Sequence, residues 1–393
     1  MENRIIPVRG FSWFGKNIGI KDETLDFGGI LSDVPCQAAA VFTKNSMPGA
    51  PVIVGKDHIK DGLLQAVIVN SKNANVATGS PGIEDAKRIC ALAANACKIE
   101  PEMVLPSSTG VIGQRLPMDK IAEGCRNIAK NFGKTTAHIG NFTQSIMTTD
   151  RWPKFIAAKA GQSRILGVAK GAGMIEPDMA TMLCYFVTDA EIKSPRLKSI
   201  LSGVADLSFN RISVDTDTST SDTAAILANG LAGAVDPEKF EMVLSEMAVY
   251  LAREIVRDGE GTTKLIELLV SGASTFEQAL LTAKTVINSP LVKTAIHGAD
   301  PNWGRFVMAI GKVRDYSTPI EDLKIFFGQG ENRLKIDAET LGQGRVPLSE
   351  IADMLKENEI FIEIVVGDGD SSARVWGCDL TESYIKLNSE YTT

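Results

Sequence analysis

The chain has 393 residues, 44% of them hydrophobic and 23% charged, with a formal net charge of −7. This composition is typical of folded globular proteins and lies far from the low-hydrophobicity, high-charge regime of disorder. The acidic balance provides no general basic surface, so we expect no nucleic-acid partner. The length predicts about two or three core-sized units.

Charged residues are spread through the first thirty positions, which leaves no apolar core for a signal peptide. Elsewhere no uncharged apolar run approaches the ~18–20 residues of a membrane helix. We therefore expect a cytoplasmic protein without a membrane partner.

Cysteine and histidine usage limits the chemistry. Six cysteines occur without any CxxC pair, and Cys90 and Cys97 share the apolar face of an expected helix. Such thiols are usually core residues, so we expect no metal and no redox role. The chain has only three histidines (His58, His138 and His297), so few residues could serve in a Ser-His-Asp triad. No motif in the sequence indicates a cofactor, and we expect none.

Helical and strand patterns alternate along the chain. Apolar residues keep helical spacing over 86–97, after Ser80-Pro81, and again over 243–256. Short apolar runs predict strands at 66–69, 182–187, 212–214, 265–270, 360–366 and 373–378. The mixture predicts an α/β fold (α+β mixed) without internal repeats.

A domain boundary is expected near Ser289-Pro290, after a helix that starts around Thr275. This places a smaller C-terminal α/β domain at about 285–393. No shift in composition marks the border.

Several tempting motifs fail. The chain has no GxxxxGK[ST], so a P-loop is excluded. The Gly-rich triplets 328–330 and 367–369 lack the third glycine of a dinucleotide fingerprint and read as turns.

Asp215, Asp217 and Asp222 follow an expected strand in the sequence VDTDTSTSDT. They can line a site, as a phosphotransferase aspartate pair or a cation loop, although the glycine and glutamate of an EF-hand are missing. Hydroxyl-rich loops more often satisfy their own backbone, and this structural interpretation is favoured.

His297 lies in HGADPNWGR. It can act as a general base, but Asp-Pro-Asn-Trp-Gly is also a strong turn with an aromatic anchor. The structural interpretation is again favoured.

The segment 170–183, KGAGMIEPDMATML, is the most informative stretch. Gly171 and Gly173 permit unusual backbone angles, Pro177 interrupts any helix, and an apolar strand follows Thr181. One interpretation is a loop entering a buried strand, with Thr181 as a capping or turn hydroxyl.

The other interpretation is chemical. A threonine hydroxyl needs a base beside it to act as a nucleophile. If the bond between Ala180 and Thr181 breaks, Thr181 gains an α-amine with a pKa of about 7.7–8.0, which can serve as that base. The strained Gly/Pro loop favours attack of the Thr181 hydroxyl on the Ala180 carbonyl.

A second segment, SSTGVIG at 107–113, suits this chemistry. The Thr109 hydroxyl and the Gly110 N–H can form an oxyanion hole for a tetrahedral intermediate. Taken alone, such a Ser/Thr/Gly loop is more often a turn.

At these residues the sequence resembles the ornithine acetyltransferase family, the bifunctional glutamate N-acetyltransferases of arginine biosynthesis. Eight stretches carry the resemblance and span nearly the whole chain: NANVATG, SSTGVIG, IMTTD, KGAGMIEPDMATML, DTDTSTSDTA, DGEGTTKLIE, NSPLVKTAIHGADPNWGR and GCDLTESYIKLNSEYTT. The acidic EPDMAT, with DGEG and the NSEYTT end, looks more like the paralogue of the clavulanic acid pathway.

The resemblance implies an N-terminal-nucleophile fold made as one precursor. It would cut itself between Ala180 and Thr181 into an α chain (1–180) and a β chain (181–393) that pair as an α2β2 heterotetramer. Thr181 would take the acetyl group from N-acetylornithine, release ornithine and pass the acetyl group to glutamate in a ping-pong reaction.

The family's functional positions fall on matching residues here. Thr109 and Gly110 match the oxyanion positions. The substrate-contacting positions are matched by Thr148, Lys170, Thr181, Glu260, Asn388 and Thr393. In this interpretation Lys170 meets the α-carboxylate of the substrate and Glu260 meets the ornithine amine.

Two other functions remain open on sequence grounds. A related N-terminal-nucleophile amidase or aminopeptidase would use water as the acceptor. A binding protein with a structural Thr181 would stay uncut and inactive. Ornithine release that needs glutamate separates the transferase from both.

Overall fold

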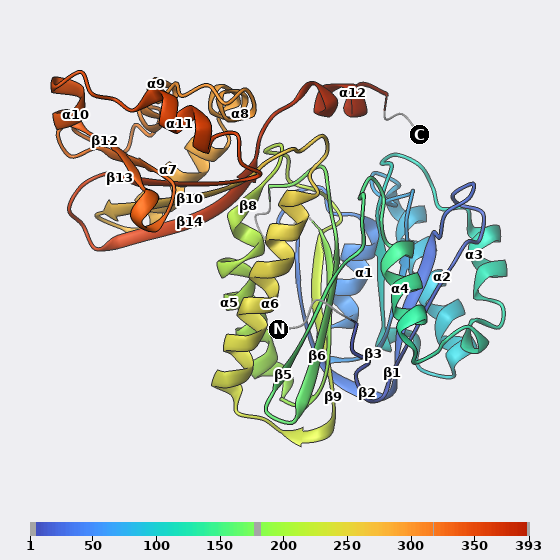
Figure 1. Ribbon diagram of the computed structural model, residues 1–393. Helices are drawn as coiled ribbons and strands as arrows, with labels where there is room; N and C mark the ends of the chain where they lie inside the picture. The colour runs from blue at the N-terminus through green and yellow to red at the C-terminus, as the bar shows by residue number, and fades with distance from the viewer. Residues whose placement is uncertain (1–4, 177–181, 317, 391–393) are drawn as a thin grey trace. The chain divides into compact units, whose positions relative to one another are not determined.

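The computed structural model describes residues 5–176, 182–316 and 318–390, and it confirms the mixed α/β class. The described residues form two compact units. The first lies within Met1–Asn210 and Asp217–Ile255, and the second within Arg211–Thr216 and Val256–Thr392. Figure 1 shows the elements of each unit in the colours of the chain.

The longer segment of the second unit begins at Val256, and the border expected at about 285 lies within it. The reason is sheet pairing, because β10 (Leu265–Ala273) lies between β13 (Glu359–Val365) and β14 (Ser371–Cys378). The short β8 (Ile212–Ser213) also joins this sheet, in parallel with β14. Pairing between strands far apart in sequence leaves no mark on local composition.

The first unit is built on an eight-stranded sheet with the order β4-β3-β2-β9-β7-β6-β5, and β1 pairs with β2. Its strands are β1 (Phe11–Lys16), β2 (Phe27–Phe42), β3 (Leu63–Asn70), β4 (Val104–Ser108), β5 (Lys154–Ala160), β6 (Ser163–Lys170), β7 (Leu183–Glu191) and β9 (Thr223–Ala234). The central β7 is buried along eight of its nine residues, which explains its continuous apolar sequence.

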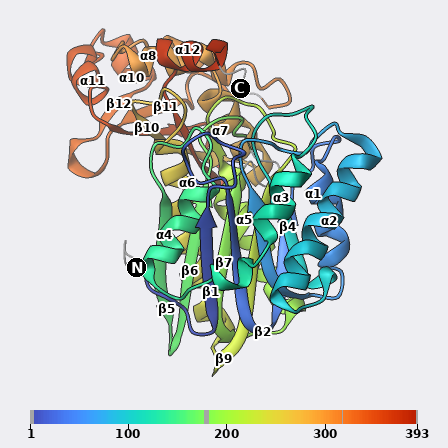
Figure 2. The same cartoon turned by 90° about the vertical axis from the view of Figure 1, so that its right-hand side faces the viewer.

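Helices cover this sheet. They are α1 (Ala50–His58), α2 (Gly79–Cys97), α3 (Met118–Cys125), α4 (Thr136–Ser145), α5 (Ser194–Leu207) and α6 (Pro237–Arg257). Figure 2 shows α4 in front of β1, where the Phe142 ring packs 5.2 Å from Trp13 and 5.9 Å from Tyr185. On α5 and α6, Arg196 donates to Glu241 at 3.0 Å, so these helices lie side by side (Figure 1).

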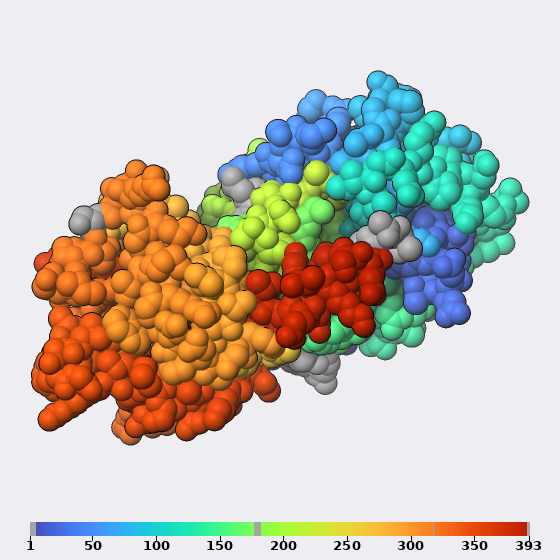
Figure 3. All heavy atoms as spheres, turned by 90° about the horizontal axis from the view of Figure 1, so that it is seen from above, coloured from blue at the N-terminus to red at the C-terminus, as the bar shows by residue number. Residues whose placement is uncertain are grey.

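The second unit has a six-stranded sheet with the order β12-β11-β13-β10-β14-β8. Its remaining strands are β11 (Lys324–Phe327) and β12 (Leu334–Ile336), and its helices are α7 (Phe276–Ile287), α8 (Pro290–His297), α9 (Gly304–Ile310), α10 (Ala338–Gly342), α11 (Leu348–Met354) and α12 (Glu382–Glu390). α7 packs on β10 and β14. α12, red in Figure 3, lies on the surface, and none of its nine residues is buried.

The element predictions hold at these positions. The expected helices correspond to α2 and α6, and the helix expected from Thr275 is α7, which Thr275 caps by accepting from the Gln278 N–H. All six cysteines are free thiols in the described ranges, and five are buried. Across those ranges, no helix combines the length and apolar character needed to cross a membrane.

Candidate active site

The connection from β6 to β7 carries the expected nucleophile. Lys170, the last residue of β6, pairs with Leu183 of β7, and Leu183 pairs in turn with Thr223 of β9. The predicted cleavage residues, Ala180 and Thr181, lie outside the described residues, and so does Thr393. The strand pairing nevertheless fixes both ends of this connection in the first unit.

The expected oxyanion loop directly follows β4. The Thr109 N–H donates to Asn70 O at 3.1 Å, and the Val111 N–H donates to Lys72 O at 3.0 Å. The Gly110 N–H between them, like the Thr109 hydroxyl, donates no hydrogen bond to any residue the structure describes. The loop therefore holds two unused donors next to each other, as an oxyanion hole requires.

Only glycine fits at position 110. Its φ is +130°, and a Cβ there would lie 2.2 Å from the carbonyl carbon of Lys72. A side chain would thus collide with backbone, which cannot move away like the end of a flexible side chain. The glycine lets the two loops approach closely enough for their hydrogen bonds to form.

Buried asparagines in the NANVATG region support this loop. The Ser108 hydroxyl donates to Asn70 Oδ1 at 2.6 Å, and Asn70 Nδ2 donates to Asn73 O at 2.8 Å. Asn73 Nδ2 donates to Arg115 O at 3.0 Å. Because buried amides are costly unless paired, this network favours a single loop geometry.

The Asp150 carboxylate accepts hydrogen bonds from one expected substrate-contacting residue and from the residue that follows another. Asp150 accepts the Thr148 N–H at 3.0 Å and the Gly171 N–H at 2.7 Å, and Gly171 directly follows Lys170. The same carboxylate accepts from Lys154 Nζ at 2.7 Å. Burial alone would raise the pKa of Asp150, but the charges of Lys154 and Lys170 outweigh it and lower the pKa to about 2.

Lys21 adds positive charge beside this segment. Its ammonium donates to Met147 O at 2.6 Å and to Leu25 O at 3.1 Å. Burial lowers the pKa of Lys21 to about 8; Asp26 opposes this shift, and the charge of Lys170 adds to it. Lys21 and Lys170 are therefore close enough to interact, which makes this region suitable for an anionic substrate group.

The aspartate-rich loop packs against the connection on both sides of 177–181. The Glu176 N–H donates to Asp217 O at 3.0 Å, and the Thr223 N–H donates to Met182 O at 3.0 Å. Asp222 is 2% exposed, and its Oδ2 has no hydrogen-bond partner among the described residues. Burial raises the pKa of Asp222 well above its usual value.

The second unit holds two more of the expected positions. Asn388 Nδ2, on α12, donates to Glu260 Oε2 at 2.8 Å. The Thr381 hydroxyl donates to Gly261 O at 2.8 Å, and a Cβ on Gly261 would lie 2.4 Å from Tyr384 N. The start of α12 thus packs directly on the loop that carries Glu260.

His297, the last residue of α8, is paired with a carboxylate. Its Nδ1 lies 2.9 Å from Asp379 Oδ2, and the Asp379 side chain is fully buried. This ordered contact supports the structural interpretation of His297.

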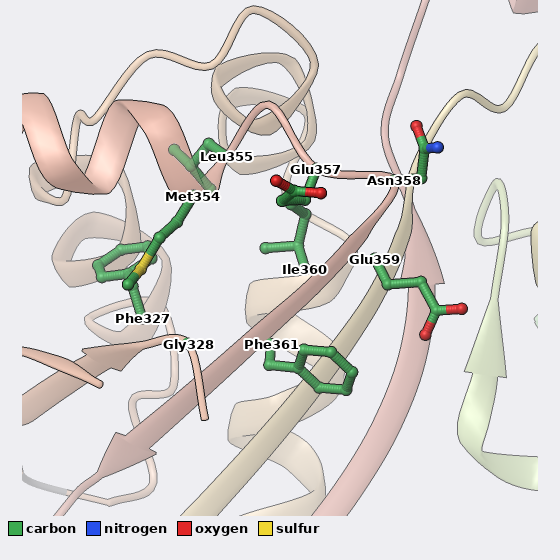
Figure 4. Close-up of a pocket in the computed structure, with 9 residues that line it drawn as sticks. All are labelled: Phe327, Gly328, Met354, Leu355, Glu357, Asn358, Glu359, Ile360 and Phe361. Atoms are coloured by element: carbon green, nitrogen blue, oxygen red, sulfur yellow. The ribbon is translucent and has the colours of Figure 1, made fainter. Parts of the chain in front are cut away.

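A separate hollow of about 400 Å³ lies in the second unit (Figure 4). Phe327, Met354, Ile360 and Phe361 give it an apolar lining, and Glu359 at its rim is bound to Arg257 at 2.6 Å. Its lining includes none of the expected substrate-binding residues that the structure describes.

Several residues of these networks escaped sequence reasoning. Asp150 lies within the IMTTD stretch, but its bond to the Gly171 N–H spans 21 residues of the chain. Lys21 lies in none of the quoted stretches, and Asp379 lies in GCDLTESYIKLNSEYTT without an assigned role, because the contacts of Lys21 with Met147 and of Asp379 with His297 span more than 80 residues of the chain. No spacing pattern in one sequence reveals such contacts.

Comparisons with known proteins agree with the motifs. The model of the ArgJ family matches residues 12–393. The arginine biosynthesis bifunctional protein ArgJ 2 of Clostridium acetobutylicum is 48% identical over 397 residues, covering 100% of this chain and 99% of that protein. Glutamate N-acetyltransferase Oat2 of Streptomyces clavuligerus is 42% identical over 390 residues, covering 98% of each.

Solved structures of similar sequence also exist. The ornithine acetyltransferase of Mycobacterium tuberculosis, solved with ornithine, is 34% identical and covers 44% of this chain and 94% of that chain, with a TM-score of 0.40.

Proposed function

The chain belongs to the ArgJ family, and from this membership we propose that it is a self-cleaving acetyltransferase that moves acetyl from N-acetylornithine to glutamate. The observation that carries the proposal is the pair of donors at Thr109 and Gly110 that bond to none of the described residues, which suits acyl transfer. The 42% identity to a glutamate N-acetyltransferase supports the choice of acceptor.

Self-cleavage would come first. The Thr181 hydroxyl attacks the Ala180 carbonyl carbon, the peptide C–N bond breaks, and the Thr181 nitrogen takes up the hydroxyl proton. Water then hydrolyses the resulting ester, which leaves an Ala180 carboxylate and restores the hydroxyl. The α-amine of Thr181 is now free to act as a base.

The transfer would follow in two half-reactions. The Thr181 hydroxyl gives its proton to the α-amine and attacks the acetyl carbon of N-acetylornithine, while Thr109 and Gly110 donate to the oxyanion. The amide bond breaks, and ornithine leaves with that proton on its nitrogen. The amine of glutamate then attacks acetyl-Thr181, which yields N-acetylglutamate and the free threonine.

The charged residues suit zwitterionic substrates. Lys170, whose charge acts on Lys21 and whose neighbour Gly171 shares the Asp150 carboxylate with Thr148, would bind an α-carboxylate. In the second unit, Glu260 Oε2 accepts a hydrogen bond from Asn388. Its Oε1 has no partner among the described residues, so this oxygen can accept a hydrogen bond from the ammonium of ornithine. Thr393 remains a further expected substrate contact.

The two products of cleavage, 1–180 and 181–393, would stay associated. β6 of the first piece and β7 of the second are neighbours in one sheet, so separating them would break a full strand pairing. We expect the pieces to assemble as an α2β2 heterotetramer.

Denaturing intact-mass spectra of the purified protein and of Thr181→Ala test the proposal. We expect two fragments that meet between Ala180 and Thr181, and one full-length mass for the variant. A full-length mass in both samples would remove the free amine from the mechanism.

Ornithine release from N-acetylornithine, with and without glutamate, tests the acceptor. We expect release to depend on glutamate. Glutamate-independent turnover would instead assign a hydrolase that uses water.

A further inference from the structure

Asp379 is a buried carboxylate that the proposed chemistry does not use. It directly follows β14, and its side chain is fully inaccessible. Oδ1 accepts the N–H groups of Thr263 and Lys264, both at 2.9 Å. Oδ2 accepts from the Thr263 hydroxyl and from His297 Nδ1, the latter at 2.9 Å.

Three of these four donors lie on the loop that carries Glu260. This loop connects α6 to β10 and contains two tight turns, in which the Gly259 N–H donates to Val256 O and the Thr262 N–H donates to Gly259 O, both at 3.0 Å. Glu260 lies in the second of these turns, and the Asp379 contacts and the start of β10 anchor the chain on its C-terminal side.

The helix α12 packs on the same loop. Gly261, with φ of +68°, lies against the first turn of the helix, where the Thr381 hydroxyl bonds Gly261 O and also accepts the Tyr384 N–H at 3.3 Å. Asn388, one turn further along, reaches Glu260. A shift of the loop would therefore move Glu260 and α12 together.

His297 holds the other side of Asp379. It ends α8, and the Lys264 ammonium caps that helix by donating to Ile296 O at 2.7 Å and to His297 O at 3.1 Å. The imidazole is 36% exposed, while its carboxylate partner is buried. α8 and the Glu260 loop are thus joined twice, through Lys264 and through Asp379.

We propose that Asp379 is a positioning residue that holds Glu260 and α12 in place for the diamino substrate, and that His297 fixes the Asp379 carboxylate. The inference rests on the proposed role of Glu260 as the ammonium-binding group. Asp379 does not touch substrate; it acts through the Thr263–Lys264 backbone.

A carboxylate suits this place because it accepts on both oxygens without donating. In Asp379→Asn, the amide nitrogen would face the Thr263 hydroxyl or the His297 ring, each of which can turn or change tautomer to accept. The variant should therefore fold with a looser loop. Thr263→Val removes only the hydrogen bond from the Thr263 hydroxyl to Asp379, and Thr263→Ser keeps this bond.

The test uses the full chain and two readouts. We expect Asp379→Asn and Thr263→Val to raise KM for N-acetylornithine by about tenfold, since each weakens the hydrogen bonds to a charged group that hold the Glu260 loop. kcat and self-cleavage should change much less, and Thr263→Ser should resemble the wild type. Backbone amide exchange should accelerate in 258–264 and in 382–390 together.

Asp337→Asn is the matched control. Asp337 caps α10 in the same unit by accepting the Thr340 N–H at 3.0 Å, and its hydrogen bonds within the described ranges do not reach the Glu260 loop. It should lower stability without changing KM or exchange in 258–264 and 382–390. Unchanged exchange in 382–390 in both Asp379→Asn and Thr263→Val would overturn the proposal.

The proposed function can fail separately. If the wild type does not release ornithine from N-acetylornithine, the role of Glu260 is lost, while the exchange measurements still show whether Asp379 positions the loop. If exchange accelerates in both segments but KM stays the same, the loop is positioned by Asp379 but does not bind the diamino substrate, and the inference as stated is wrong.

Discussion

Asn388 and Glu260 are 128 residues apart in the chain, yet the Asn388 side-chain amide donates to Glu260 Oε2 at 2.8 Å. This bond joins the last helix, α12, to the loop before β10. It occupies one carboxylate oxygen and leaves the other for a ligand. The amide therefore orients Glu260 rather than neutralising it.

Asn388→Ala should raise KM for N-acetylornithine by about fivefold and leave kcat nearly unchanged. An exposed hydrogen bond to a charged group contributes about 1 kcal/mol, and the Asn388 side chain is exposed. Steady-state kinetics with N-acetylornithine as the varied substrate measure this. Ser389→Ala on the same helix is the control, because the Ser389 hydroxyl bonds Lys386 O within α12 itself. Equal KM values for the two variants would contradict the role of Asn388.

Gly110→Ala should reduce kcat by about 100-fold or more, because the added Cβ would push Lys72 and the oxyanion donors apart. Gly113→Ala is a matched control: its φ of +85° is also positive, but a Cβ there meets nothing within 4 Å. The control should lose some stability through backbone strain and keep most of its kcat. If both variants lose activity equally, strain in the loop explains the effect and the close approach to Lys72 does not.

The two kinds of residue around the candidate site differ in what the sequence says of them. Thr109 and Gly110 stand in a short motif that suggests an oxyanion hole locally, and Lys170 was expected from the family resemblance; the structure describes a loop at the first two and a strand end at the third, and their roles stay predictions. Asp150 and Asp379 act by accepting hydrogen bonds from distant backbone, which no local pattern encodes.

In the fold, too, features set by local sequence were predicted, and features set by distant pairing were not. Apolar periodicity predicted the central strands, such as β7 and β10, because burial on both faces demands continuous apolar sequence. The second unit also takes in residues 211–216, because β8 joins its sheet from residues 212–213 and pairs with β14, more than 150 residues later. Propensity contains no information about which strands pair.

Lys154→Met should destabilise the protein by about 3–5 kcal/mol, because it leaves the Asp150 carboxylate buried without its ion-pair partner. Urea unfolding at pH 7 measures the loss. Lys60→Met is the control, since the Lys60–Asp57 pair has the same kind of contact at 2.6 Å but is 74% and 64% exposed. Exposed pairs contribute about 0–1 kcal/mol. A small, similar loss in both variants would show that the buried pair is unimportant for stability.

The pH dependence of the wild type follows from the same pair. The pKa of Asp150 is lowered in the folded state, from its ordinary value near 4 to about 2. Its contribution is therefore complete above about pH 4 and is lost as the pH falls from about 4 to about 2. Unfolding free energies between about pH 2 and pH 6 should show this loss in the wild type, and Asp150→Asn should lack it.

Asp222→Asn should stabilise the chain increasingly as the pH rises. Burial raises the pKa of Asp222, and the Ser219 hydrogen bond and the charge of Lys170 offset this only in part. A group with a raised pKa in the folded state contributes most below its unfolded pKa, and this contribution is lost as the pH rises, because an ionised carboxylate must then stay buried, with no hydrogen bond to Oδ2 from the described residues. Asparagine carries no charge and escapes that cost.

Both forms should be compared in a Thr181→Ala background, so that only the uncut chain unfolds. Urea unfolding at about pH 5 and about pH 8 gives, at each pH, the difference in unfolding free energy between the chain with Asp222 and the Asp222→Asn variant. If this difference is the same at both pH values, folding does not change the pKa of Asp222. The neighbours of Asp222 would then stabilise its ionised carboxylate as well as water does.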